Sequence, residues 1–327
     1  MALAFIVGGG LNDVPGSGGA LYERHAAVRR TYAEIEEWTG LSFERLIHDP
    51  LPATELRFRE GIGALRQAAV AFSIADLLAE QGVLPDVVGG LSLGAMVSAS
   101  LAGAVSRAEL FGLLTAVRST PLPPEDAPPQ GIAMVFTARD EAGLASLAQR
   151  AGVYPAVDVG PVGDGGYRMV MYAGYRDRLE RFAAEAPEGV TVRIPPDRPV
   201  AFHSPLQRHL AEHLRPWLDA MTFRDPVIPL CSCLQALTLT TAAQVRDLFE
   251  RNSVETVSVP HVRLQMRRHG VRLAIVLGPS KIDGIAEQSF PLTYVETPED
   301  VEVALAAVND LGLSSPARTR AGPGARG

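Results

Sequence analysis

The sequence predicts an α/β fold made of a larger part and a smaller part inserted into it. A short apolar run, Val87-Val88, leads into the residues G-G-L-S-L-G at 89–94, and small and apolar residues follow at helical spacing. This order indicates a strand, a sharp turn and a helix, as in α/β-hydrolase-like folds. Residues 133–194 then alternate as strand, helix, strand, strand, helix and strand, which is the order of a ferredoxin-like unit.

Prolines mark both ends of the smaller part. They interrupt helices and central strands, and they stand at Pro121, Pro123, Pro124, Pro128, Pro129, Pro195 and Pro196. We therefore expect an α/β-hydrolase-like core over residues 1–130 and 196–313 and a ferredoxin-like part over 131–195. The tail 314–327 is rich in Ser, Pro, Ala, Arg and Gly, and we expect it to be disordered.

The spacing of apolar residues predicts the elements of each part. In the larger part we expect helices at 21–38, 62–81, 104–118 and 206–220, and strands at 2–7, 198–203, 227–234 and 272–277. In the smaller part we expect strands at 133–137, 153–159, 167–172 and 190–194, and helices at 139–151 and 175–186.

A glycine run, Gly8-Gly9-Gly10, directly follows the first predicted strand. Glycines let backbone N–H groups approach a ligand closely, so we expect Gly9 and Gly10 to contact a substrate. The alternative is a plain flexible turn.

Composition excludes several classes of protein. The chain has 327 residues and a net charge of −7, so it lacks the excess of positive charge that is typical of general nucleic-acid binding. We see no apolar run of membrane-span length and no basic start of a signal peptide, and therefore expect a cytoplasmic protein without a membrane partner. Cys231 and Cys233 have a spacing that suits neither a disulfide framework nor a zinc site. We expect buried reduced thiols, no metal and no cofactor.

Ser92 stands at the centre of a G-x-S-x-G pattern. A nucleophile at the tip of such a turn has strained backbone, and side chains two residues before and after it would collide with neighbouring backbone; Gly90 and Gly94 remove them. The Ser92 hydroxyl is then held at the start of a helix, where backbone N–H groups can stabilise an oxyanion. The alternative is a glycine-rich turn with an incidental serine.

Three motifs together resemble the malonyl-CoA:acyl-carrier-protein acyltransferase family: G-L-S-L-G at 90–94, Arg118, and A-F-H-S at 201–204. The resemblance covers about residues 4–310. It implies an enzyme that moves a malonyl-type acyl group from CoA to the thiol of an acyl carrier protein, with Ser92 as nucleophile and His203 as general base. The alternative for His203 is a structural histidine.

The resemblance also implies the groups that support this chemistry. A backbone carbonyl at or near Asn252 would orient His203, and the N–H groups of Leu93 and Leu11 would form the oxyanion hole. These donors and this acceptor belong to the main chain, so a change of side chain does not remove them.

The choice of acyl group is predicted from two further residues. A planar guanidinium can bind a carboxylate through two parallel hydrogen bonds, so Arg118 would select a malonyl-type group over acetyl. Its alternative is an arginine at a helix end that faces water. Phe202, beside His203, resembles the family variant associated with malonyl, because a bulky ring leaves little room for an α-methyl branch.

Four positions depart from the pattern usual in the family, each with the loss of a polar group: Leu11, Leu91, Ala95 and Gly160-Pro161. We therefore expect an active but divergent, stand-alone acyltransferase that serves polyketide or other specialised biosynthesis. Alternatives are the malonyl-transferring subunit of a malonate decarboxylase, a carrier-protein thioesterase or other hydrolase, and a non-catalytic docking subunit.

A basic segment at 261–272 is the candidate docking site for an acidic carrier protein. It carries Arg263, Arg267, Arg268 and Arg272 on what we predict to be one helix. The alternative is a solvated helix face.

Overall fold

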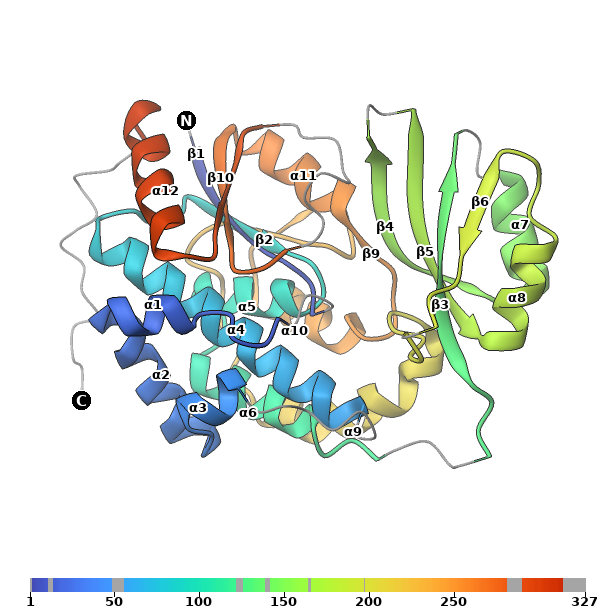
Figure 1. The fold of residues 1–327 in the computed structure, drawn as a ribbon, viewed down its shortest axis with the longest axis horizontal. Coiled ribbons are helices and arrows are strands. Elements are labelled where there is room, and N and C mark those ends of the chain that lie inside the picture. Colours follow the sequence, from blue (N-terminus) through green and yellow to red (C-terminus); the bar gives the residue numbers. More distant parts are fainter. Residues whose placement is uncertain are drawn as a thin grey trace.

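The computed structural model describes residues 2–10, 14–48, 56–121, 126–138, 142–163, 166–196, 198–280 and 290–313. The predicted tail 314–327 and the predicted oxyanion donor Leu11 lie outside these residues. Within the described part the strands form two sheets, which Figure 1 shows side by side, each with its own helices.

The larger sheet is built around the first strand. Its order is β11 (Leu292–Val295), β10 (Val271–Leu277), β1 (Ala2–Val7), β2 (Val87–Gly90), β7 (Leu230–Cys231) and β8 (Thr238–Leu239). All neighbouring pairs from β11 to β7 are parallel, and β8 pairs antiparallel with β7. Nearly every residue of β1 and β10 is buried, as expected for parallel strands covered on both faces.

Ten helices of the described residues belong to the larger part. They are α1 (Gly19–Arg24), α2 (Ala26–Thr39), α3 (Phe43–His48), α4 (Leu56–Glu80), α5 (Leu93–Leu101), α6 (Arg107–Val117), α9 (Arg208–Ala220), α10 (Ala242–Arg251), α11 (Val259–Arg268) and α12 (Pro298–Asp310). A short 3-10 helix, η1 (Pro205–Gln207), precedes α9.

The smaller sheet has the order β6 (Val190–Arg193), β3 (Gln130–Thr137), β5 (Tyr167–Tyr175), β4 (Tyr154–Val162) and β9 (Val257–Ser258). Helices α7 (Ala142–Ala151) and α8 (Arg176–Ala184) complete the ferredoxin-like succession of strands and helices, so the predicted fold class is confirmed. Strand β9 comes from outside the predicted range 131–195 and pairs parallel with β4. The predicted limits of the parts stay a prediction.

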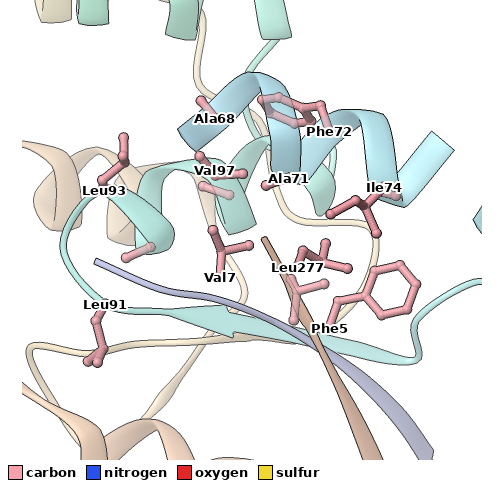
Figure 2. Packing of buried hydrophobic residues seen from close by; sticks show 14 of the residues in the cluster. Phe5, Val7, Ala68, Ala71, Phe72, Ile74, Leu91, Leu93, Val97 and Leu277 are labelled. Atoms are coloured by element: carbon pink, nitrogen blue, oxygen red, sulfur yellow. The ribbon is translucent and has the colours of Figure 1, made fainter. Parts of the chain in front are cut away.

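The core of the larger part lies between α4 and the sheet. Figure 2 shows Ala71 and Ile74 of α4 pointing toward Val7 of β1 and Leu277 of β10, all of them buried. Along α4, Ile62–Glu80 is long and apolar enough to cross a membrane by length and composition. The expectation that no run reaches this length was therefore wrong, but 83% of the qualifying window is buried, as in a core helix.

Several predicted elements differ from the structure for local reasons. The helix predicted at 21–38 is divided into α1 and α2, because His25 is extended (φ −121°, ψ 124°). The strand predicted at 198–203 does not form, and the Ala201 N–H donates to the Gln130 side chain instead of a neighbouring strand. The strand predicted at 227–234 shrinks to β7, because the Ser232 hydroxyl accepts the N–H groups of two following residues and turns the chain.

The glycines of the G-x-S-x-G turn are required by close backbone contacts. A Cβ on Gly90 would lie 2.4 Å from the carbonyl carbon of Gly94, and one on Gly94 would lie 2.0 Å from the carbonyl oxygen of Val7. Neither neighbour can move aside without distorting β1 or α5. The collision predicted from the sequence is therefore present at both positions.

Gly94→Ala should lower the free energy of unfolding by about 3 kcal/mol or more, because backbone must shift to admit the methyl group. Gly112→Ala is the matched control, since a Cβ at this α6 position would meet nothing within 4 Å. It should leave stability unchanged or raise it by up to about 1 kcal/mol. Urea unfolding of the two variants checks this, and equal stabilities would contradict it.

Candidate active site

The site begins where β1 and β2 end side by side. Val7 pairs with Gly90 in the parallel register, so the glycine run after β1 lies against the turn after β2. A Cβ on Gly9 would be 3.8 Å from Cβ of Ser92, and one on Gly10 would be 3.7 Å from Cβ of Leu93. The structure thus brings Gly9 next to Ser92 and Gly10 next to Leu93, on either side of the start of α5.

Ser92 is the residue immediately before α5 and has strained backbone, with φ 57° and ψ −118°. A positive φ is rare in residues other than glycine and costs about 1–3 kcal/mol. The conformation directs the hydroxyl out of the turn at the start of a helix. This is the geometry of the nucleophile elbow that the motif predicts.

His203 meets Ser92 from a distant part of the chain. Its Nε2 lies 2.8 Å from the Ser92 Oγ. His203 is buried and also has a positive φ, 52°. The turn around it is held by the Ser204 hydroxyl, which donates to the Ala201 carbonyl (2.6 Å) and accepts the Leu206 N–H (3.3 Å).

The other nitrogen of His203 contacts the end of a helix. Nδ1 lies 2.6 Å from the backbone carbonyl oxygen of Asn252, which directly follows α10. A carbonyl can only accept, so Nδ1 carries the proton and Nε2 is left to accept from the Ser92 hydroxyl. The structure therefore brings Ser92, His203 and Asn252 together in one hydrogen-bonded series.

Burial controls the protonation of His203. Desolvation lowers its pKa to about 4, and hydrogen bonds to the backbone of Asn252 and Glu255 only partly oppose this. The imidazole is consequently neutral at pH 7 and able to take a proton from Ser92.

Of the two predicted oxyanion donors, the structure describes Leu93. It is the first residue of α5, so its N–H has no acceptor one turn earlier in the helix. The glycine run on the other side is held by Gln67, whose Nε2 donates to the carbonyls of Gly8 (3.1 Å) and Gly9 (3.0 Å). Gln67 was missed from the sequence, although a polar residue on an apolar, buried helix is a recognisable signal.

Cys233 is a second residue that the sequence did not connect with the site. Both cysteines are buried and free, as predicted. Burial raises the pKa of the Cys233 thiol to about 11, although a hydrogen bond with the Ser92 backbone lowers it somewhat. The neutral thiol thus contacts the backbone of the strained serine.

Phe202 lies in the turn before η1 and α9, and Arg118 lies at the end of α6, which contacts α9. The Phe202 ring is 5.7 Å from the His203 ring, edge to face. Arg118, half-buried, directly follows α6. The end of α6 packs against α9, since Nε2 of His213 lies 3.3 Å from the Ala116 carbonyl oxygen and 3.3 Å from the Ser119 hydroxyl. Arg118 therefore stands beside the helix that follows the His203 turn.

The predicted basic helix is shorter than expected. Helix α11 ends at Arg268, and Gly270, with φ 68°, turns the chain into β10. Arg272 lies in β10, so the prediction that it shares a helix with the other arginines was wrong. Arg267 and Arg268 are exposed at the end of α11, and Arg263 is partly buried.

Comparison with known proteins agrees with this geometry. No family model matches the chain. Its sequence is 25% identical over 320 residues to the malonyl CoA-acyl carrier protein transacylase of Bacillus subtilis, covering 94% of this chain and 98% of that protein. The fold matches a malonyl CoA-acyl carrier protein transacylase from Clostridium perfringens, with a TM-score of 0.84, 17% identity and coverage of 96% and 99%.

A similar fold also occurs in a larger assembly. The acyltransferase domain from the second module of the salinomycin polyketide synthase matches with a TM-score of 0.80 and 23% identity, over 98% of this chain and 76% of that one. Fold and sequence similarity together define the chain as an acyltransferase enzyme. Its sequence and fold are similar to those of malonyl-CoA:acyl-carrier-protein acyltransferases, the family that its motifs resemble.

The pKa of His203 predicts an unusual acid limit for the reactivity of Ser92. Below the pKa the imidazole is protonated and cannot accept the serine proton, so labelling of Ser92 by a fluorophosphonate should fall with a midpoint at about pH 4. Above about pH 5 the rate should be flat. Mass spectrometry of the labelled protein measures this, with His203→Ala as the slow control at every pH. A midpoint near about 6.5, the ordinary histidine pKa, would contradict it.

Proposed function

We propose that this enzyme transfers a malonyl-type acyl group from CoA to an acyl carrier protein through an ester on Ser92. The observation that carries the proposal is the hydrogen-bonded series from Ser92 through His203 to the Asn252 carbonyl, built on a strained strand-to-helix turn. A buried, neutral imidazole next to a serine hydroxyl is the arrangement that nucleophilic acyl transfer needs.

In the first half-reaction, Nε2 of His203 takes the proton of the Ser92 hydroxyl while Oγ attacks the thioester carbonyl. The resulting oxyanion accepts hydrogen bonds from the N–H of Leu93 and from that of Leu11. The intermediate then collapses, the C–S bond breaks, and the proton on His203 passes to the departing CoA thiolate. Ser92 is left as an ester and His203 is neutral again.

The second half-reaction runs the same steps in reverse. The carrier thiol gives its proton to His203 and attacks the Ser92 ester, and the collapsing intermediate releases Oγ, which recovers the proton. Leu91 and Leu93 beside the nucleophile are both buried, which favours a thiol on a long arm over bulk water as the acceptor.

Arg118 and Phe202 give the acyl preference. A carboxylate on the acyl group would pair with the Arg118 guanidinium, and the Phe202 ring against His203 narrows the space beside the reacting carbonyl. The names of the relatives, which include malonyl transacylases and a polyketide synthase domain, agree with a malonyl-type donor and with a role in specialised biosynthesis.

The exposed Arg267 and Arg268 at the end of α11 are the proposed docking site for an acidic carrier. Helix α11 begins directly after β9, at the junction of the two sheets. Arg267 and Arg268 stand at the opposite end of this helix, where Gly270 leads into the start of β10.

Intact-protein mass spectrometry after brief exposure to malonyl-CoA, acetyl-CoA and methylmalonyl-CoA tests the proposal. We expect a malonyl adduct on the wild-type protein, little adduct from the other donors, and none on Ser92→Ala. Arg118→Ala should lose the preference for malonyl over acetyl, because the carboxylate loses its partner.

Adding a carrier protein with its phosphopantetheine thiol then follows the second half-reaction. The adduct should move to the carrier, and Arg267→Glu with Arg268→Glu should raise the apparent KM for carrier while leaving self-acylation unchanged. Release of free malonate without transfer would identify a hydrolase instead. Absence of any adduct and any turnover would contradict the proposed function.

A further inference from the structure

We propose that the ion pair between Arg251 and Glu255 is a positioning pair for the reaction: it holds rigid the turn whose carbonyl orients His203. This inference rests on the proposed function, in which His203 is the general base. It concerns side chains that contact neither the nucleophile nor the imidazole.

His203 needs an external support of this kind. Its backbone has a φ of 52°, so local structure alone does not favour its conformation. Its imidazole is oriented by the Asn252 carbonyl, a main-chain group at the end of α10. Helix ends fray unless something fixes them, and a carbonyl that drifts by a fraction of an ångström no longer directs Nε2 at the serine.

The ion pair spans this helix end. Nε of Arg251 lies 2.7 Å from Oε1 of Glu255, and Nη2 lies 2.6 Å from Oε2, so the pair has two parallel hydrogen bonds. The third guanidinium nitrogen, Nη1, lies 2.5 Å from the Asp247 carboxylate one turn earlier on α10. Asn252 lies in the sequence between Asp247 and Glu255, the two residues whose carboxylates the guanidinium joins.

The backbone of the same turn closes on Arg251 as well. The N–H groups of Val254 and Glu255 both lie 3.1 Å from the Arg251 carbonyl oxygen. The chain then leaves toward the smaller sheet, where the Thr256 hydroxyl donates to the Pro155 carbonyl at 2.7 Å. The turn is therefore held at one end by α10 and at the other by the smaller sheet. The ion pair links Arg251 to Glu255 across the turn on its solvent-exposed side.

The backbone of Glu255 lies toward His203, whereas its side chain is partly exposed to solvent. The backbone of Glu255 contributes, with that of Asn252, to raising the pKa of His203 against the effect of burial. Its side chain is 43% exposed and that of Arg251 is 29% exposed. A substitution that keeps the size of the Glu255 side chain therefore loosens the turn without opening a cavity in the core.

The chain supplies a matched control on the same helix. Arg246 and Glu250 have the same residue types at the same spacing, with Nε of Arg246 2.8 Å from Oε1 of Glu250. This pair lies within α10, where the backbone is already fixed by helical hydrogen bonds. Loss of the Glu250 charge should thus reproduce the electrostatic change without releasing the Asn252 turn.

Glu255→Gln should lower kcat for acyl transfer on the order of tenfold with the KM for acyl donor unchanged, because the geometry of the base is lost and no substrate contact is removed. Glu250→Gln should leave both constants within about twofold of wild type. Arg251→Gln should lower kcat by the same factor as Glu255→Gln. The double variant, which combines Arg251→Gln with Glu255→Gln, should lose no more kcat than either single variant. Arg251→Lys keeps the charge but cannot make two parallel hydrogen bonds to the carboxylate. Its kcat should therefore lie between those of wild type and Arg251→Gln.

Circular dichroism melts show whether each variant is folded at the assay temperature. A kcat for Glu255→Gln equal to that of wild type would overturn the inference, as would a loss matched by Glu250→Gln, a rise in KM alone, or independent losses that multiply in the double variant. If wild-type protein forms no Ser92 adduct, the proposed function fails instead, which separates the two outcomes.

Discussion

The proposed active site depends on the hydrogen bond from His203 to the carbonyl of Asn252. This acceptor carries no full charge, but it stands at the C-terminal end of α10, where the helix dipole places partial negative charge. The combination suits a buried base. Burial lowers the pKa of His203 to about 4, so the imidazole is neutral at pH 7. In the proposed reaction, the carbonyl would stabilise the imidazolium that forms when the serine proton arrives.

The ends of β1 and β2 in the larger sheet position the serine side of the contact between Ser92 and His203. Parallel β1 and β2 bring the glycine run to the serine turn, and Gly90 and Gly94 allow the backbone contacts that hold it. The two residues in contact, Ser92 and His203, are the two described residues other than glycine with a positive φ. Strained backbone of this kind persists only where the surrounding structure enforces it. The conformations of Ser92 and His203 therefore depend on the buried ends of β1 and β2 and on the turn after α10.

Local sequence patterns predicted the fold class, the first strand and the serine turn, because apolar spacing and glycine placement act over a few residues. The pairing of Ser92 with His203, 111 residues apart, came from a family resemblance. Cys233 and Glu255 were missed for a physical reason: each acts on or through backbone atoms of other residues, and such contacts leave no spacing to detect. Gln67 left a signal as a polar residue on an apolar helix, but nothing in the sequence identifies its partners, the carbonyls of Gly8 and Gly9. The strand expected at 198–203 failed because its backbone bonds a glutamine side chain.

The most direct test of the account is the imidazole of His203 itself, observed by nitrogen-15 NMR across a pH titration with His203→Gln for assignment. We expect a proton on Nδ1, none on Nε2 at neutral pH, and protonation with a midpoint at about pH 4. A proton on Nε2 at neutral pH, or a midpoint near about 6.5, would contradict the claim that a buried, neutral base is held by the end of α10.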